Sequence, residues 1–226
     1  DGHARALLAD GRVLFCGGRY SGGIPQPRLD AQVYDPVSKT ATTVANMTTG
    51  RCGHVAVPLP DGTVLVVGGD SNVMTPTAEL FDPQTSSFRS LGAVPVSLTS
   101  PYAVSVRDPA TAGLFVLIGG GWGVNNVSDL AMLWEVNAGK VVASVQMGRK
   151  RLDAAAVALP GFGAVLVTGG SDGNGRHRRD AELFFLPARK FFPWGGLTTP
   201  RAGHSMVRLD ASHMLVLGGG PTQQGS

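Results

Sequence analysis

The residues best suited to chemistry in this chain are arginines, and they are densest in two short clusters. The clusters are Arg149-Lys150-Arg151 and Arg176-His177-Arg178-Arg179. A guanidinium group presents a planar fork of donors that matches a carboxylate or a phosphate. The clusters therefore predict a dock for an acidic protein segment or another anionic ligand. The alternative interpretation is a pair of solvated loops with ordinary surface charges.

Other candidate binding residues lie elsewhere in the chain. Arg19, Arg28, Arg51 and Arg201 add positive charge, and Trp122 follows a run of three glycines. A tryptophan exposed on a loop would be a candidate anchor for a partner, and a tryptophan packed into the loop is the alternative.

Arginine and histidine each recur at one position of a sequence repeat. The recurring residues are Arg51, Arg151 and Arg201, and His3, His54 and His204. Recurrence favours a structural role before a chemical one. We expect the arginines to bond backbone carbonyls between repeats or to line the mouth of a channel, and the histidines to bond backbone within a strand hairpin.

Catalytic and metal-binding motifs are absent from the sequence. There is no Gly-x-Ser-x-Gly, no phosphate loop and no His-Glu-x-x-His. Asp172-Gly173-Asn174-Gly175 matches the start of a calcium loop, but its remaining ligands are missing. The recurrent histidines lie in separate repeats, and no close spacing of His, Cys and Asp indicates zinc. We predict no catalytic residue, no metal and no cofactor.

These residues are positioned by a repeat whose signature is an apolar strand ending in two glycines. The first glycines are expected at Gly17, Gly68, Gly119, Gly169 and Gly218, at steps of 51, 51, 50 and 49. A constant period near 50 residues indicates a repeat architecture. Glycine suits these positions because it reaches positive φ and lets another backbone approach closely.

The second period shows the expected organisation of a repeat, with four strands that we call a, b, c and d. Residues 54–59 read as strand a, and the Asp-Gly at 61–62 is a hairpin signal. Residues 64–67 form the unbroken apolar run of a buried strand b. Residues 78–82 and 87–91 read as strands c and d.

These residues resemble the kelch family. The matching features are Arg51 before His54, the pair Gly68-Gly69, the turn Phe81-Asp82-Pro83 and the late Phe88, with Tyr34-Asp35-Pro36 as the turn of another repeat. The third repeat departs from the pattern, with Tyr102 where His54 would stand. The resemblance covers essentially the whole chain and implies an all-β fold, a kelch-type β-propeller with one four-stranded sheet, or blade, per repeat.

The resemblance predicts one domain over residues 1–226. Its blades would be about 3–50, 51–98, 99–150 and 151–200, with a partial blade at 201–226. Four full blades and a half blade make a small or incomplete propeller, and we expect the chain to be part of a longer one. The half blade could be completed by strands from elsewhere in that parent chain or from another molecule, including by self-association, because an open sheet edge invites pairing.

The predicted topology gathers the long b–c loops and the links between blades on one face. These loops are residues 19–30, 70–77, 121–128 and 171–180. Rigid scaffolds present variable loops for binding. Many kelch proteins are substrate adaptors or cytoskeletal binders, so the resemblance implies a scaffold that binds a protein partner through this face and is not an enzyme.

The alternative is a kelch enzyme that uses the central channel, either carbohydrate-active or similar to the copper radical oxidases. The oxidases need a Tyr-His pair and a tyrosine linked to a cysteine. The tyrosines here are Tyr20, Tyr34 and Tyr102, and none precedes a histidine.

Composition sets broader limits. The net charge of +3 is too small to indicate nucleic-acid binding by itself, and the apolar runs have strand length, so none is expected to span a membrane. The two cysteines, Cys16 and Cys52, are expected as buried thiols in neighbouring repeats, with a disulfide as the alternative. Two cysteines do not make a disulfide scaffold, which favours a reducing, cytoplasmic location, with secretion as the alternative.

Overall fold

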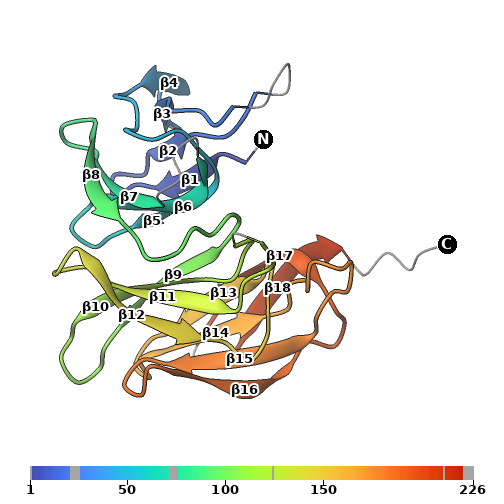
Figure 1. The fold of residues 1–226 in the computed structure, drawn as a ribbon. Helices are drawn as coiled ribbons and strands as arrows, with labels where there is room; N and C mark the ends of the chain where they lie inside the picture. The colour runs from blue at the N-terminus through green and yellow to red at the C-terminus, as the bar shows by residue number, and fades with distance from the viewer. Residues whose placement is uncertain (1, 21–25, 72–75, 124, 211, 221–226) are drawn as a thin grey trace. The chain divides into compact units, whose positions relative to one another are not determined.

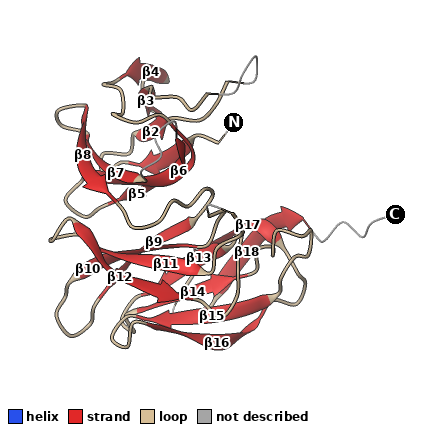
Figure 2. Cartoon of the chain, in the orientation of Figure 1, coloured by secondary structure: helices blue, strands red, loops and turns tan. Residues whose placement is uncertain are grey.

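The computed structural model describes residues 2–20, 26–71, 76–123, 125–210 and 212–220. In these residues the chain forms eighteen β-strands and no helix (Figure 2). Accordingly, no described segment is a helix long and apolar enough to cross a membrane. The prediction of an all-β protein is confirmed. The chain divides into two compact units, residues 1–100 and 101–226, and each is treated separately below.

The first unit contains two antiparallel four-stranded sheets, each built from consecutive strands (Figure 1). One sheet has the order β1 (Ala4–Leu7), β2 (Val13–Cys16), β3 (Ala31–Asp35) and β4 (Thr40–Thr43). The other has the order β5 (Arg51–Pro58), β6 (Val64–Ser71), β7 (Thr77–Asp82) and β8 (Ser87–Ala93). These are the first and second repeats.

The second unit contains two further four-stranded sheets and one two-stranded sheet. The third repeat comprises β9 (Tyr102–Arg107), β10 (Leu114–Gly119), β11 (Leu130–Glu135) and β12 (Lys140–Gln146). The fourth comprises β13 (Ala155–Leu159), β14 (Ala164–Thr168), β15 (Asp180–Phe185) and β16 (Lys190–Gly196). The fifth comprises β17 (Ala202–Arg208) and β18 (Met214–Gly220). The predicted strands a to d are therefore present in four repeats, and a and b in the fifth.

Strand b of the second repeat is buried in its sheet, as its apolar sequence predicts, whereas β18 of the fifth repeat is largely exposed. The side chains of residues 64–67 in β6 are all fully buried. In the first unit a core lies between the two sheets, where Leu14 and Val33 pack with Val66 and Phe81. In the second unit a similar core of aliphatic and aromatic side chains lies between the third and fourth repeats. Burial of these side chains is the main favourable contribution to folding.

The glycine turns have the expected backbone geometry, with one correction. Both glycines have positive φ at 17–18, 68–69, 169–170 and 218–219, but in the third repeat the pair is Gly120-Gly121 and not Gly119-Gly120. Gly119 ends β10 opposite Tyr102, and a Cβ there would meet the Tyr102 hydroxyl at 2.6 Å. Gly119 therefore leaves room for the Tyr102 side chain, and Gly120 and Gly121 form the turn.

In the first four repeats, the second glycine of the turn is bonded to the start of the next repeat. The N–H of Gly18 donates to the carbonyl of Arg51 at 2.7 Å, and that of Gly69 donates to Leu98 at 2.7 Å. In the second unit, Gly121 donates to Arg151 and Gly170 to Arg201. This shared bond identifies equivalent positions, so Leu98 takes at the start of the third repeat the position that arginine holds in the second, fourth and fifth.

Three long b–c loops are only partly described. Residues 21–25, 72–75 and 124 of the predicted binding face lie outside the described residues, as do residues 221–226 of the predicted partial blade.

Candidate functional site

Two recurrent arginines are buried, which corrects their assignment to a partner-binding surface. Arg51 begins β5, and its Nη1 donates to the carbonyls of Gly68 at 3.0 Å and Thr77 at 2.9 Å. Its Nη2 lies 3.2 Å from Oε1 of Glu79, and both side chains are almost fully buried. The guanidinium is thus bonded within its own sheet, and it is not presented to a partner.

Arg151 repeats this arrangement in the fourth repeat. Its Nη1 donates to the carbonyls of Gly169 at 2.7 Å and Asp180 at 3.0 Å. Its Nη2 lies 3.0 Å from Oε2 of Glu182 and also bonds the Asp180 carboxylate. The expectation of bonds to backbone carbonyls is confirmed for both arginines, although the carbonyls belong to the same repeat.

Arg201 keeps only part of these contacts. Its Nη1 donates to the carbonyl of Gly218 at 2.6 Å, and its Nη2 donates to Oγ1 of Thr199 at 3.1 Å. Among the described residues no carboxylate contacts it, and the side chain is half-buried. Of Arg51, Arg151 and Arg201, it is therefore the one whose guanidinium is paired with no carboxylate of the described residues and can bind one from a partner.

The glutamates that pair with the buried arginines were missed in the sequence. Glu79 and Glu182 occupy the same position of strand c, where they pair across the sheet with Val66 and Val167. The equivalent residue in the third repeat is Met132, opposite Ile118. This pairing could have been inferred from the sequence. Glutamate occurs in the second and fourth repeats, which carry the buried arginines, and it is absent from the third repeat, where leucine replaces the arginine.

His54 and His204 contact side chains of the preceding repeat and not the backbone of their own hairpin, which corrects that expectation for these two histidines. Nε2 of His54 lies 3.3 Å from Sγ of Cys16, and Nε2 of His204 lies 2.9 Å from Oγ1 of Thr168. Cys16 and Thr168 end strand b of the preceding repeat. His54 and His204 therefore join neighbouring sheets, one in each unit, while the ring of His3 lies against Phe15 of its own sheet.

The Cys16–His54 contact has the composition of a catalytic dyad but the wrong protonation. Burial raises the pKa of the Cys16 thiol to about 12. Burial, assisted by the charge of Arg51, lowers the pKa of His54 to about 3. Both shifts favour a neutral thiol beside a neutral imidazole, whereas a nucleophilic cysteine needs a thiolate. The pair is a structural contact.

The cysteines form no disulfide. Cys16 is buried in β2 and Cys52 is half-buried in β5, in neighbouring repeats as predicted. The expected burial is therefore confirmed for Cys16 only.

The two basic clusters of the second unit are neighbours, as predicted. Nε of Arg178 donates to the carbonyl of Lys150 at 2.9 Å, and the N–H of Arg201 donates to the carbonyl of Arg178 at 3.0 Å. Arg178 is half-buried and lies 3.8 Å from Asp180. The cationic residues left exposed are Arg149, Lys150, Arg176 and Arg179, and we call these four the basic patch.

Trp122 and His177 lie in the loops around the basic patch. Trp122 is 44% exposed, and a Cβ placed on Gly173 would lie 3.4 Å from its ring, so the indole packs against the 171–180 loop. His177 is half-buried, and its Nδ1 lies 2.8 Å from the carbonyl of Gly220. The structure thus brings Trp122 to the loop that carries the second cluster.

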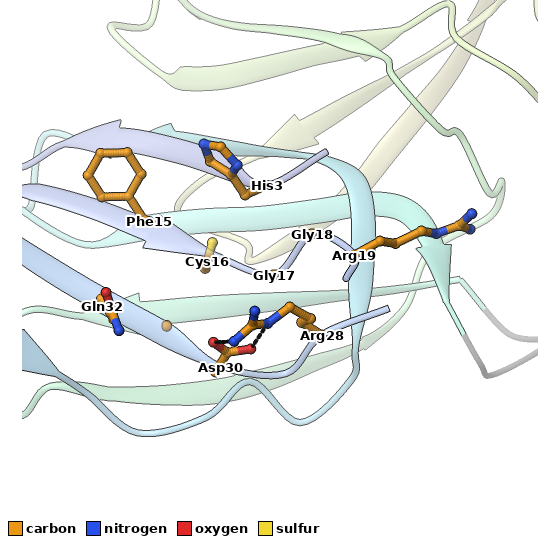
Figure 3. A pocket seen from close by; sticks show the side chains of 10 residues that line it. His3, Phe15, Cys16, Gly17, Gly18, Arg19, Arg28, Asp30 and Gln32 are labelled. Carbon is orange, nitrogen blue, oxygen red and sulfur yellow. Dashed lines mark hydrogen bonds and ion pairs between the residues drawn. The ribbon is translucent and has the colours of Figure 1, made fainter. Parts of the chain in front are cut away.

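Arg19 and Arg28 belong to the first unit, where they line a polar cavity of about 360 Å³ (Figure 3). In Figure 3 the side chains of Arg28 and Asp30 point toward each other and are joined by hydrogen bonds. The guanidinium of Arg28 also lies 4.0 Å above the ring of Tyr20. The hydrogen bonds from Arg28 lower the pKa of the Asp30 carboxyl, so both groups stay ionised. Their opposite charges offset each other, which leaves little net charge for a ligand.

In the part of the chain that the structure describes, no group of three or more His, Cys, Asp or Glu side chains is arranged to hold a metal ion. The hydroxyl of Tyr102 donates to Sδ of Met147 at 3.2 Å, and burial raises the pKa of this phenol. Tyr102 is therefore a neutral core residue.

Comparison with known proteins informs the fold only. No protein-family model matches the chain, and no curated protein matches it. Among solved structures the chain is similar to one described as "Structure of YjhT", with a TM-score of 0.80 and 16% sequence identity. The similarity covers 99% of this chain and 78% of that one. At this identity it shows an all-β fold of antiparallel four-stranded sheets and carries no function with it.

Proposed function

We propose that this chain is a kelch-type β-propeller protein whose basic patch binds an acidic segment of a protein partner. The propeller is supported by four sheets of consecutive antiparallel strands and a fifth, two-stranded sheet, all built on one glycine-ended repeat. Each sheet would be a blade, with the fifth a half blade. The single observation that carries the binding role is the Arg178–Lys150 hydrogen bond, which joins two cationic segments.

The charge of the basic patch is available to a ligand. None of its four side chains forms an ion pair within the described residues, in contrast to Arg51 and Arg151. Exposed guanidinium groups without a carboxylate can bind one from a partner in bidentate fashion. Because the patch is solvated, the attraction should weaken as salt is added.

Trp122 extends the proposed site with an apolar surface. Its exposed ring rests against the loop that bears Arg176 and Arg179. Aromatic and arginine side chains are the usual centres of binding energy in protein interfaces. An acidic segment that also carries an apolar residue would therefore fit this site better than a purely acidic one.

The test is binding of a fluorescein-labelled peptide that alternates glutamate and leucine, followed by anisotropy. The triple variant Arg149→Glu, Lys150→Glu and Arg179→Glu should weaken binding by about tenfold or more, which corresponds to about 1.4 kcal/mol. Arg151 is left intact because its burial makes reversal a folding defect.

The matched control changes the same number of charges in the same unit. Lys140→Glu, Arg189→Glu and Lys190→Glu reverse three exposed residues at the c–d turns. This control should bind about as well as the unmodified protein. Equal binding by the patch and control variants would remove the basic patch as the site.

A further inference from the structure

The fourth repeat carries a cavity of about 300 Å³ at the edge of the basic patch. The cavity is lined by Gly148 and Arg149 of the link into the repeat, by residues 180–182 at the start of strand c, and by Pro193 and Gly195 near the end of strand d. Its volume is at the lower end of the range for ligand pockets, and glycine, alanine and proline give it short walls. These segments all belong to a complete repeat and to the link that leads into it.

The link into the fourth repeat is bonded less completely than the link into the second. In the second repeat, the N–H groups of residues 48–49 both donate to the carboxylate of Glu79, at 2.6 and 3.2 Å. In the fourth, the N–H of Gly148 donates to Glu182 at 2.6 Å. Arg149, however, forms no hydrogen bond or ion pair within the described residues. It therefore offers both a backbone N–H and a guanidinium to a ligand at the cavity.

Asp180 supplies an acceptor at the same cavity. It is the first residue of β15, and its side chain is 41% exposed. The buried Arg151 bonds Oδ2 of its carboxylate. The nearest cation to Oδ1 is Nη1 of Arg178 at 3.8 Å, which is too long for a hydrogen bond. Among the described residues Oδ1 has no donor, so it can accept a hydrogen bond from a ligand.

The charges around the cavity favour a neutral donor as the ligand of Asp180. The carboxylates of Asp180 and Glu182 stand against three guanidinium groups, those of Arg149, Arg151 and Arg178. The sum is one positive charge, so a lysine side chain would gain nothing there, whereas a glutamate would meet Asp180 directly. A hydroxyl group donates to a carboxylate without adding charge. Threonine has this hydroxyl on a short side chain, together with a methyl group for the apolar walls.

We propose that this cavity holds a threonine of the partner's acidic segment and that Asp180 selects it. The threonine hydroxyl donates to Oδ1 of Asp180, its methyl group lies against Ala181 and Pro193, and the neighbouring acidic residue of the segment binds Arg149. A glutamate in place of the threonine is disfavoured by like-charge repulsion, which gives the site specificity within acidic sequences. This inference rests on the function proposed for the basic patch and defines what that patch selects.

The second repeat provides a variant that removes the charge of Asp180 and keeps its structural contact. Thr77 occupies the equivalent position there, and its Oγ1 accepts from Nη2 of Arg51 at 2.6 Å, as the Asp180 carboxylate accepts from Arg151. Asp180→Thr should therefore fold with an oxygen still bonded to the buried guanidinium. Urea unfolding of the variant checks this before any binding is measured.

Three fluorescein-labelled peptides provide the test. Each places one residue, threonine, valine or glutamate, between two glutamates and has glycine elsewhere, so the register is fixed. Followed by anisotropy, the threonine peptide should bind the unmodified protein about tenfold more tightly than the valine peptide, which has the same shape but no hydroxyl. In Asp180→Thr protein this preference should fall to within about twofold. The peptide with the central glutamate should instead bind that variant about fivefold more tightly than it binds the unmodified protein.

Two variants control this experiment. Glu135→Gln removes one negative charge at the end of β11, at a c–d turn of the same unit, and should leave all three affinities within about twofold of the unmodified protein. The triple basic-patch variant should weaken all three by about tenfold or more. Because the comparison of the threonine and valine peptides uses the unmodified protein, a folding defect cannot produce its result.

The outcomes separate this inference from the proposed function. Equal binding of the threonine and valine peptides, with binding still lost in the triple variant, would overturn the inference and leave the basic patch as a site. A threonine preference that survives Asp180→Thr would do the same. Failure of all three peptides to bind, or binding that is unaffected by the triple variant, would overturn the proposed function and this inference with it.

Discussion

The Nη2 atom of Arg51 lies 3.2 Å from Oε1 of Glu79, and the two side chains are exposed by only 1% and 0%. Burial lowers the pKa of the guanidinium, while the Glu79 carboxylate acts in the opposite direction. The pair is tolerated because each group is also bonded to the backbone, Arg51 to two carbonyls and Glu79 to the N–H of Thr48. A buried charge without such partners is costly.

A double-mutant cycle will measure this relationship. Arg51→Leu and Glu79→Met should each lower the free energy of unfolding by about 3–5 kcal/mol, because each leaves a buried charge unpaired. The combined variant copies the third repeat, which has Leu98 and Met132 at these positions. Its loss of unfolding free energy, measured by urea unfolding, should be smaller than the sum of the two single losses by about 2 kcal/mol or more. Additive losses would show that the two side chains are not coupled.

Two glycines with nearly equal φ will separate steric from conformational effects. Gly169 has φ 59° and Gly139 has φ 62°. A Cβ on Gly169 would meet the Arg201 carbonyl at 2.5 Å and the His204 ring at 2.7 Å, whereas a Cβ on Gly139 would meet nothing within 4 Å.

Gly139→Ala should therefore cost about 1 kcal/mol, because alanine is strained in the left-handed region. Gly169→Ala should cost about 3 kcal/mol or more, because backbone must move as well. Both values can be read from the shift in the urea midpoint. Equal losses would contradict the close approach of the two repeats at Gly169.

The low pKa of His54 predicts a loss of stability in mild acid. The unfolded chain binds a proton at this histidine near its ordinary pKa of 6.5, whereas the folded protein binds it only near pH 3. The contribution of His54 is therefore fully present above about pH 6.5 and declines as the pH falls toward 3. Between about pH 7.5 and pH 5 the loss from this residue should be about 2 kcal/mol.

His54→Gln is the comparison for this prediction. The variant should be less stable at neutral pH but should lose about 2 kcal/mol less over the same interval, as followed by urea unfolding at each pH. Aspartates with lowered pKa, such as Asp30, act mainly below about pH 4 and are common to both proteins. Parallel pH profiles would mean that His54 accepts a proton in the folded state.

Cys16 should resist thiol reagents until the protein unfolds. Its pKa of about 12 and its burial leave only about one thiolate in ten thousand at pH 8. In a Cys52→Ser variant, labelling by iodoacetamide at pH 8 should be at least about a hundredfold slower in the native protein than in denaturant. Rapid native labelling would reopen the interpretation of Cys16 and His54 as a reactive pair.

The repeat and its strands could be predicted from the sequence because their signals are local. An apolar run, a glycine pair and an Asp-Gly turn specify a hairpin by their own conformational preferences. The third repeat shows the limit of this reasoning. Three consecutive glycines, 119–121, allow two registers, and the choice depends on the contact between Gly119 and Tyr102, which only the paired strands reveal.

The candidate site was harder to predict because one residue type serves two purposes. Arg51 and Arg149 both lie near the start of a repeat, yet one is buried on Glu79 and the other is exposed. The difference lies in a glutamate on another strand, which sheet pairing brings into contact. The proximity of Lys150 and Arg178 could be predicted because topology places links and b–c loops together.

The bond from the second glycine of a turn to the next arginine has a consequence for synthesis of the chain. A turn such as Gly17-Gly18 cannot complete its hydrogen bonds until Arg51 has left the ribosome, because the acceptor is the carbonyl of that residue. The same delay applies to Gly170, which waits for Arg201. Each repeat would therefore emerge with an open turn that its successor closes, so that the nascent chain matures one repeat behind the point of elongation.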